Sequence, residues 1–341
     1  MWRIRSCRYS DLNALLALAN EVGEGMTSIP KTSLGWRRKI ADAEASFAGQ
    51  PDAGSYFLVL EDLSNGNIVG TTAVYNGVGE KRPYFALRHD KRKHALYLEN
   101  AMTGASEIGS LFLSSTARIK GLGRALSQAR FLMMACFPQL FSNTVMASCR
   151  GWLDENNDSP VWHAIGQFYA DIDFKDVVEL TAEKGNQWLA NALPNTLSLR
   201  HISPEIVAML GKPHEESAPA HSILSGENFV QSDFIDLADG GPTLTCPPTK
   251  IASYKASFTA KLERAKRPLQ NEEMFLIAGG NLHNFEIFVC RGERQSNQVI
   301  LVDDSAKMLL DKHINKRVKA LQIQGSDDML ARLKQTTDQA A

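Results

Sequence analysis

The stretch SEIGSLFLSSTARIKGLGRALSQARFLMM, residues 106–134, places glycines and cationic residues between a short apolar run and a long amphipathic one. The unpaired N–H groups that open a helix, together with the helix dipole, bind phosphate groups, and glycine lets a ligand approach the backbone closely. The glycine and cationic positions are Arg118, Lys120, Gly121, Gly123 and Arg124. The stretch therefore predicts a site for a phosphate or pyrophosphate group where the second run begins.

This stretch matches neither of two common nucleotide-binding loops, and a purely structural explanation also stays open. Its spacing is neither G-x-x-x-x-G-K-[ST] nor G-x-G-x-x-G, so it matches neither the phosphate loop of nucleoside triphosphatases nor the dinucleotide fingerprint. A tight turn from a strand into a helix, with arginines that only face solvent, would also explain these residues. The surrounding elements and the rest of the chain must distinguish these interpretations.

Composition and charge exclude several classes of protein. The chain has 341 residues, a formal net charge of -1 and 44% hydrophobic residues, which indicates a globular protein and argues against general nucleic-acid binding. Its five cysteines are odd in number and contain no C-x-x-C pair, so neither a disulfide framework nor a metal site is expected. No apolar run approaches the roughly 18 residues of a membrane span, and the N-terminal run is too short for a signal peptide. We expect a cytoplasmic protein with no membrane partner and no permanently bound cofactor.

Hydrophobic periodicity predicts the elements that must position the phosphate site. Strands are predicted within residues 2–9, 56–78, 106–113, 145–154, 274–292 and 297–304. Helices are predicted within residues 10–22, 121–136 and 159–172. The first strand alternates weakly and fits a sheet edge, whereas residues 56–78 fit two antiparallel strands joined at SNGN.

Strands before and after a helix that opens with glycines indicate an α/β or α+β fold, with helices packed on a mixed sheet. Residues 1–245 are predicted to form the main domain and residues 246–325 a small β-rich C-terminal subdomain. Residues 326–341 are polar and are predicted to be a tail that frays.

The spacing Arg118-x-x-Gly121-x-Gly123 resembles the [RQ]-x-x-G-x-[GA] pyrophosphate loop of the N-acetyltransferase superfamily. This resemblance implies an N-acetyltransferase-like fold, with a mixed, mostly antiparallel central sheet flanked by helices. In that superfamily the strand before the loop splays from its neighbour, and the acyl-pantetheine arm lies beside it. The corresponding strand of this chain carries Leu111, Phe112 and Leu113.

Longer segments resemble the arginine N-succinyltransferase family, in the same order along nearly the whole chain. They are GEGMTSIP (23–30), YFLVLEDLSNGNIVG (56–70), TGASEIGSLFL (103–113), CRGWLDENNDSPVW (149–162), PHEESAPAHSIL (213–224) and DGGPTLTC (239–246). The resemblance implies transfer of a succinyl group from succinyl-CoA to the α-amino group of L-arginine in arginine catabolism. An acyltransferase for ornithine or another amine, and a CoA-binding partner subunit of a hetero-oligomer, remain as alternatives.

The family resemblance also implies roles for individual residues. His214 corresponds to the catalytic histidine, a proton donor, and imidazole exchanges a proton near neutral pH. Residues expected to bind the cosubstrate succinyl-CoA are Leu111, Phe112, Leu113, Arg118, Gly121, Gly123 and Arg124. Residues expected to bind the other substrate groups are Thr27, Ser28, Arg88 and Glu107, with Glu107 suited to a guanidinium and Arg88 to the succinyl carboxylate. A homo- or hetero-oligomer is expected.

Overall fold

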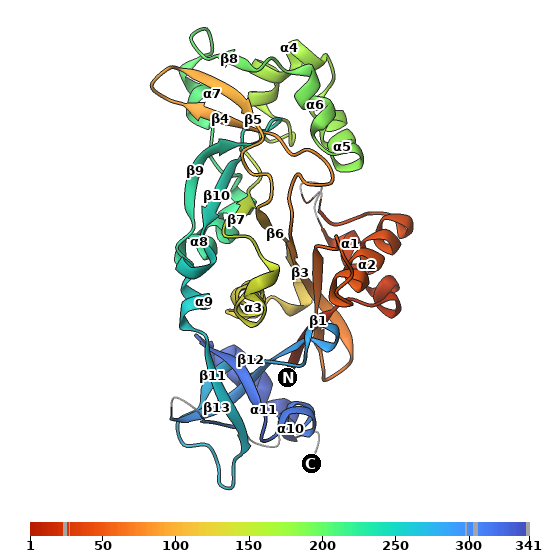
Figure 1. Cartoon of the computed structure of the whole chain (residues 1–341), viewed down its shortest axis with the longest axis vertical. Helices are drawn as coiled ribbons and strands as arrows, with labels where there is room; N and C mark the ends of the chain where they lie inside the picture. Colours follow the sequence, from red (N-terminus) through yellow and green to blue (C-terminus); the bar gives the residue numbers. More distant parts are fainter. Residues whose placement is uncertain (23–25, 27, 297–298, 303–305, 339–341) are drawn as a thin grey trace.

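The computed structural model describes residues 1–341 apart from 23–25, 27, 297–298, 303–305 and 339–341. The strands are β1 (Trp2–Ser6), β2 (Ser55–Asp62), β3 (Asn67–Tyr75), β4 (Ala86–Asp90), β5 (Ala95–Glu99), β6 (Ser106–Leu113), β7 (Val145–Ser148), β8 (Thr196–Ser198), β9 (Val230–Ile235), β10 (Pro242–Cys246), β11 (Phe258–Arg264), β12 (Glu273–Gly279), β13 (Glu286–Ser296), β14 (Val299–Val302) and β15 (Arg317–Ile323). They join into one mixed sheet along the long axis of the molecule, in the order β12-β15-β11-β14-β13-β1-β2-β3-β6-β7-β10-β9-β4-β5-β8 (Figure 1).

Helices cover this sheet and fill its long connections. The α-helices are α1 (Leu12–Glu21), α2 (Ser33–Phe47), α3 (Leu122–Cys136), α4 (Gln167–Ala170), α5 (Phe174–Lys184), α6 (Gln187–Ala192), α7 (Pro204–Met209), α8 (Ala218–Gly226), α9 (Ala252–Ala256), α10 (Lys307–His313) and α11 (Asp327–Asp338). Single turns of other helix types are η1 (Tyr9–Asp11), η2 (Ser115–Ala117), η3 (Pro138–Leu140), η4 (Trp162–Gly166), η5 (Glu215–Ser217), η6 (Pro248–Lys250) and η7 (Leu282–Asn284). None of the helices in the described part of the chain is long and apolar enough to cross a bilayer.

The predicted hairpin, strand and helix around the phosphate stretch are confirmed. β2 and β3 pair antiparallel, β6 begins and ends at residues 106 and 113, and α3 begins one residue after the predicted start. Because successive strand residues face opposite sides, Leu58 and Leu60 of β2 pack in the core that contains α3. Phe57 and Val59 pack on the other face with α1 and α2. The site strands are therefore held between two helical layers.

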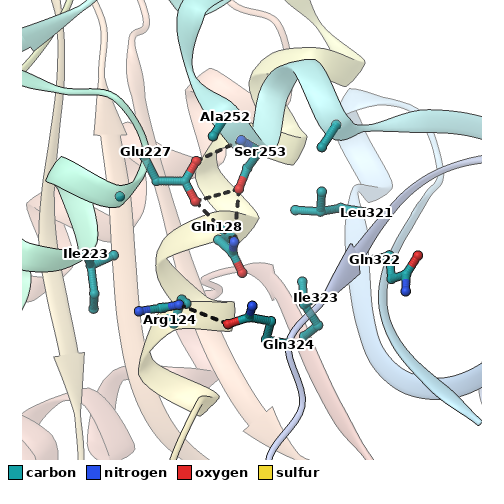
Figure 2. Close-up of a pocket in the computed structure, with 12 residues that line it drawn as sticks. Arg124, Gln128, Ile223, Glu227, Ala252, Ser253, Leu321, Gln322, Ile323 and Gln324 are labelled. Carbon is teal, nitrogen blue, oxygen red and sulfur yellow. Dashed lines mark hydrogen bonds between the residues drawn. The ribbon is translucent and has the colours of Figure 1, made fainter.

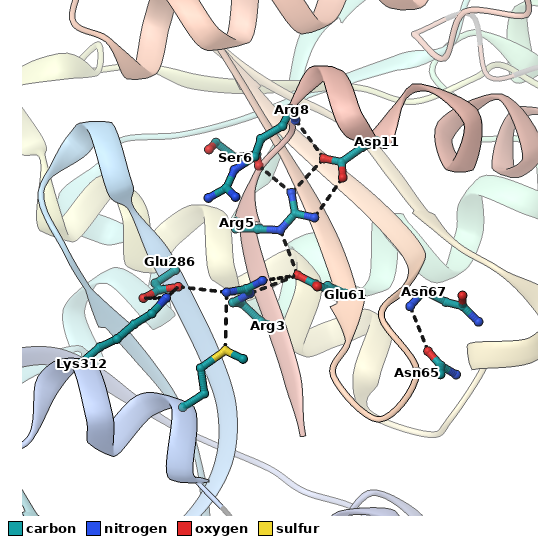
Figure 3. A network of polar contacts seen from close by, with 11 residues as sticks. Arg3, Arg5, Ser6, Arg8, Asp11, Glu61, Asn65, Asn67, Glu286 and Lys312 are labelled. Carbon is teal, nitrogen blue, oxygen red and sulfur yellow. Dashed lines mark hydrogen bonds and ion pairs between the residues drawn. The ribbon is translucent and has the colours of Figure 1, made fainter.

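β1 is an interior strand, so the prediction of an edge strand is wrong. It pairs antiparallel with β2 on one side and with β13 on the other. Trp2 and Ile4 are buried, whereas Arg3 Nη2 and Arg5 Nε both donate to Glu61 Oε2, over 2.7 and 2.9 Å (Figure 3). The arginines that suggested a solvent-facing edge are neutralised by a carboxylate on the neighbouring strand, and this allows them inside a sheet.

The β-rich C-terminal region shares the sheet of the main body. Its five strands, β11 to β15, form a closed ring because β12 pairs with both β15 and β13. β13 also pairs with β1, which joins the ring to the rest of the sheet. The polar tail predicted from residue 326 is instead helix α11. Met329 and Leu333 lie on one face of this helix and are buried, at 0% and 3% exposure. The boundary predicted at residue 245 stays a prediction.

Candidate active site

An opening lies beside β6 in the central sheet. β6 and β7 run parallel but pair only at Ser106↔Val145 and Glu107↔Met146, so the rest of β6 has no strand neighbour on that side within the described residues. The opposite side of β6 pairs with β3 through a bulge at Ser110, whose φ is +51°. Bulges bend a strand and redirect its backbone groups, so this one changes the course of β6 next to the opening.

The bulge is held by polar contacts from two segments, strand β3 and the loop that contains Ser28. Thr71 Oγ1 of β3 donates to the Ser110 carbonyl over 2.8 Å, and the Tyr75 hydroxyl lies 2.6 Å from Ser110 Oγ. Ser110 Oγ in turn donates to the Ser28 carbonyl over 3.3 Å. The predicted substrate residue Ser28 therefore lies at the bulge, while Thr27 lies outside the described residues.

The three apolar residues predicted to contact the acyl donor divide between the two faces of β6. Leu111 and Leu113 pack against the core that contains α3, and Phe112 packs against the core of α1 and α2. All three stay partly exposed, unlike the residues at the heart of either core. Their side chains thus have a packing role, and the strand still presents accessible surface beside the opening.

The fold requires glycine at one of the two glycine positions of the phosphate stretch but not at the other. Gly121 is the N-cap of α3 with a φ of +94°, and a Cβ placed there would lie 2.9 Å from Met329 Sδ, so the fold itself requires glycine. A Cβ on Gly123 would meet nothing nearer than Leu113 Cδ2, at 4.0 Å. Gly123 therefore leaves space over the first turn of α3 that the fold does not need.

The start of α3 presents unpaired backbone N–H groups, the feature that binds anions at helix N-termini. No described acceptor receives the backbone N–H of Gly121, Gly123 or Arg124, as expected for the first turn of a helix. The segment before the helix is fixed by Glu21, whose carboxylate accepts from Ser115 N over 3.1 Å. The structure thus brings the predicted glycine loop to the end of β6, with its first amides unpaired.

His214 precedes η5 and is held against the segment that follows β7. Its backbone N–H donates to the Arg150 carbonyl over 2.8 Å, and its side chain is 14% exposed. His214 Nδ1 accepts the Glu216 backbone N–H over 3.2 Å. A neutral imidazole that accepts at Nδ1 carries its proton on Nε2, so His214 is oriented to donate from Nε2.

Three of the family-like segments meet at Gly151. Pro213 forms an isolated antiparallel bridge with Gly151, and Asp239 Oδ2 accepts the Gly151 N–H over 2.8 Å. Asp239 Oδ1 accepts the Gly241 N–H over the same distance. A Cβ on Gly151 would lie 2.2 Å from the Asp239 carbonyl oxygen, so the close approach requires glycine. Segments 149–162, 213–224 and 239–246 are therefore one structural unit around His214.

Glu107, Asp236 and Asp239 form an acidic cluster at the closed end of the opening. Burial raises the pKa of Glu107 to about 7, with a further increase from the charge of Asp236, while the Ser148 hydrogen bond and the charge of Lys39 act in the opposite direction. Burial and the charge of Asp236 also raise the pKa of Asp239. In the described part of the chain, no lysine, arginine or histidine forms an ion pair with any of the three. No described ion pair therefore neutralises the cluster, and a cationic ligand would favour the ionised form of its carboxyl groups.

Four polar side chains of this region were missed by the sequence analysis, namely Asp236, Asp239, Tyr84 and Ser148. The Tyr84 hydroxyl lies 3.2 Å from Ser148 Oγ, and burial and the charge of Glu107 raise the pKa of Tyr84. Asp239 could have been found from its place in the DGGPTLTC segment. Tyr84 and Ser148 had no comparable signal in their local sequence.

Arg88 is neutralised within its own hairpin. Its Nε donates to Glu99 Oε1 over 2.7 Å, and its guanidinium lies over the Tyr97 ring, 4.6 Å from the centroid. The described contacts do not bring it to the acidic cluster or to the start of α3. Its predicted role with the succinyl carboxylate stays a prediction.

Residues 2–253 match the family model described as arginine N-succinyltransferase beta subunit. The chain belongs to the arginine N-succinyltransferase family. It is 31% identical to the arginine N-succinyltransferase of Salmonella paratyphi B over an alignment of 313 residues, which covers 87% of this chain and 91% of the relative. The arginine N-succinyltransferase of Salmonella typhimurium gives the same values. The predicted family and its acyltransferase class are confirmed.

A solved structure supports the same assignment at the level of the fold. The arginine/ornithine succinyltransferase subunit AI from Pseudomonas aeruginosa aligns with a TM-score of 0.83 and 25% identity, over 95% of this chain and 99% of that chain. The similarity thus extends through the ring of C-terminal strands. The predicted fold class, a mixed and mostly antiparallel sheet flanked by helices, is confirmed.

Proposed function

We propose that this chain transfers the succinyl group of succinyl-CoA to the α-amino group of L-arginine. The observation that carries the proposal is the opening along β6, which has unpaired helix amides at one end and the acidic cluster at the other. A CoA thioester carries a diphosphate and arginine carries a guanidinium, so the two ends match the two substrates in charge. Membership in the family supports the same reaction.

In this proposal succinyl-CoA lies along the free side of β6. Its diphosphate binds the amides of Gly121 and Gly123, with Arg118 supplying positive charge and Arg124 facing the same cosubstrate from the first turn of α3. The pantetheine arm follows residues 111–113, and the thioester lies near the Ser110 bulge. The acyl group then points toward Glu107, where the second substrate binds.

The reaction requires the protein to position the two substrates and to supply one donor to the leaving sulfur. The reference pKa of an α-amine is close to 8, so its deprotonation at neutral pH costs on the order of 1 kcal/mol. The amine nitrogen bonds to the thioester carbon, and N–H groups of β6 that face the opening stabilise the oxyanion. As the C–S bond breaks, His214 Nε2–H donates a hydrogen bond to the departing sulfur, and the proton lost by the amine nitrogen is transferred to that thiolate, so CoA leaves as the thiol.

The acidic cluster supplies recognition of the acceptor. Glu107 and Asp236 bind the guanidinium, because carboxylates match its fork of N–H donors. Ser28 offers its hydroxyl and backbone at the bulge. Arg88 remains our candidate for the succinyl carboxylate, which would replace Glu99 as its partner. Ornithine, whose side chain is also cationic, is the second candidate acceptor, since the similar Pseudomonas protein is named for both amino acids.

The reaction is tested by release of CoA thiol from the purified chain, with acetyl-CoA and succinyl-CoA each offered arginine, ornithine or lysine. We expect the fastest release from succinyl-CoA with arginine. A preference for acetyl-CoA would contradict the succinyl assignment. Absence of release with every pair would instead favour a CoA-binding partner subunit.

The role of His214 is tested by His214→Ala, with His201→Ala as the control because His201 is exposed and lies outside the site segments. Loss of the donor to the leaving sulfur should lower kcat about 100-fold or more while CoA affinity changes little. The His201 variant should behave as the wild type. Unchanged turnover in His214→Ala would remove this residue from the mechanism.

The loop is tested by Gly123→Ala, since the protein leaves room for this Cβ. The variant should fold as the wild type and bind CoA more weakly, because the new methyl group takes the space above the helix amides. Gly121→Ala is the matched comparison, and it should lower stability as well because of its positive φ. Wild-type affinity of Gly123→Ala for CoA would place the diphosphate elsewhere.

A further inference from the structure

A cavity of about 260 Å³ with a mixed polar and apolar wall lies between α3 and the C-terminal strands (Figure 2). Arg124 and Gln128 line it from one face of α3, Ile223 from α8, Ser253 from α9, and Ile323 and Gln324 from the end of β15. Its volume is several times the roughly 30 Å³ that one water molecule occupies, so it can hold a heterocyclic ring. The reaction proposed above assigns no role to this cavity.

The cavity begins where the proposed diphosphate site ends. Arg124 belongs to the first turn of α3, whose N–H groups are unpaired, and it also lines the cavity. Gln128 lies one helical turn further along the same face. A ligand whose diphosphate binds the start of α3 can therefore continue into the cavity without crossing the helix.

The C-terminal region both walls the cavity and fixes the loop. Ser326 Oγ donates to the Lys120 carbonyl over 2.6 Å, and Met329 packs against Gly121. Arg124 Nη1 donates to Gln324 Oε1 over 3.4 Å, a long contact that a phosphate could replace. These contacts tie residues 324–329 to the start of α3 on the side that faces the cavity.

Gln128 offers an acceptor in the cavity wall that no described hydrogen bond uses. Glu227 accepts from Ser253 N over 2.7 Å and from Gln128 Nε2 over 3.1 Å. Burial lowers the pKa of the nearby Arg130 to about 9, and the negative charge of Glu227 acts in the opposite direction. Gln128 Oε1 has no hydrogen-bond donor within the described residues. The Glu227 carboxylate is thus occupied, while the Gln128 carbonyl can accept from a ligand.

We propose that this cavity binds the 3′-phosphoadenosine end of coenzyme A, with Arg124 on the 3′-phosphate and Gln128 Oε1 on the amino group of the base. Ile223 and Ile323 supply apolar surface for the two faces of the ring. The β-rich C-terminal region is then part of the cosubstrate site and more than a structural appendage. This inference rests on the proposed function, because that function supplies the CoA ester.

The test is calorimetric binding of CoA, dephospho-CoA and adenosine 3′,5′-bisphosphate to the full chain. Wild type should bind CoA about tenfold or more tightly than dephospho-CoA, as a charge-assisted phosphate contact requires. Arg124→Ala should bring this ratio close to one. Ile223→Trp, which fills the cavity from the partly exposed face of α8, should weaken all three ligands and raise the KM for succinyl-CoA without changing kcat.

The controls separate failure of the cavity from failure of the reaction. Arg118→Ala removes a cation near the diphosphate that does not line the cavity, so it should weaken CoA and dephospho-CoA equally. If Ile223→Trp and Arg124→Ala keep the wild-type ratio and affinities while succinyl transfer persists, the nucleotide binds elsewhere and only this inference is overturned. If wild type binds none of the three ligands, both proposals are overturned.

Discussion

Two groups of charged side chains on the same sheet are built on opposite principles. In the paired cluster beside β1, Arg3, Arg5 and Lys312 face Asp11, Glu61 and Glu286 over 2.7 to 3.5 Å (Figure 3). The acidic cluster beside β6 has Glu107, Asp236 and Asp239 and no described ion pair. Burying an unpaired charge destabilises a fold, whereas a paired charge is largely compensated. The first cluster thus serves the fold, and the second fits a ligand that brings the missing positive charge.

The largest effect is expected from breaking the paired cluster. Glu61→Ala leaves Arg3 and Arg5 without their shared carboxylate, and it should lower the free energy of unfolding by about 3 kcal/mol. Urea denaturation measures this change. Glu263→Ala is the control, because its ion pair with Lys261 is exposed and should matter by less than about 1 kcal/mol. Equal effects of the two variants would contradict the contrast between the clusters.

The second effect concerns activity. Glu107→Gln keeps the size of the side chain and removes its charge, so kcat/KM for arginine should fall about 30-fold, or roughly 2 kcal/mol, with stability maintained or slightly raised. The KM for succinyl-CoA should not change. Glu155→Gln is the matched control, since Glu155 is an exposed carboxylate of segment 149–162. An equal loss for arginine and for succinyl-CoA would mean that Glu107 acts on the fold and not on the acceptor.

The sequence predicts elements whose signal is local. Residues 106–113 alternate over one short run, and Gly121 and Gly123 mark the helix start, so β6, the loop and α3 could all be placed. β1 could not be placed as an interior strand, because its partner β13 lies near the other end of the chain. Helix α11 was missed because, among the residues whose burial is described, the buried Met329 and Leu333 are what distinguish it from a polar tail.

The acidic cluster shows why the site could be predicted only in part. Glu107 and His214 lie in segments with a family resemblance, and this was enough to select them. Asp236 and Tyr84 join the cluster through strand register and chain reversal, which no local pattern encodes. The same holds for the cavity wall at Gln324, which the C-terminal ring brings to the start of α3.

The third prediction uses pH to separate the two clusters. The pKa of Glu107 is raised from 4.5 to about 7, so the folded state binds more protons than the unfolded state between these values. Its contribution to stability is therefore present below pH 4.5, falls as the pH rises to about 7, and is constant above. Arginine needs the ionised carboxylate, so its Kd should decrease as the pH rises through about 7.

The contribution of Glu61 to stability changes with pH in the opposite direction. Burial alone would raise its pKa, but Arg3 and Arg5 lower it below its ordinary value of 4.5. The stabilising contribution of Glu61 is present at neutral pH and is lost as the pH falls through its lowered pKa.

The prediction for Glu107 is measured by calorimetric titration with arginine between about pH 5.5 and 8, where the Kd should depend on pH and Glu107→Gln should weaken that dependence. A dependence unchanged in that variant would assign the titration to another group.

The smallest effect should come from the rim of the paired cluster. Lys312 Nζ lies 2.8 and 2.9 Å from the two Glu286 oxygens, yet its side chain is 44% exposed. Glu286 also keeps His313 Nε2 at 3.2 Å and Arg3 at 3.5 Å, so Lys312→Ala removes only one of its partners. Exposed ion pairs contribute about 0–1 kcal/mol, and urea denaturation should show a loss in that range. If Lys312→Ala lowered the free energy of unfolding as much as Glu61→Ala, the loss of an ion pair would destabilise the protein equally whether the pair is buried or exposed. The unpaired carboxylates of the acidic cluster would then have to contribute to folding and not only to ligand binding.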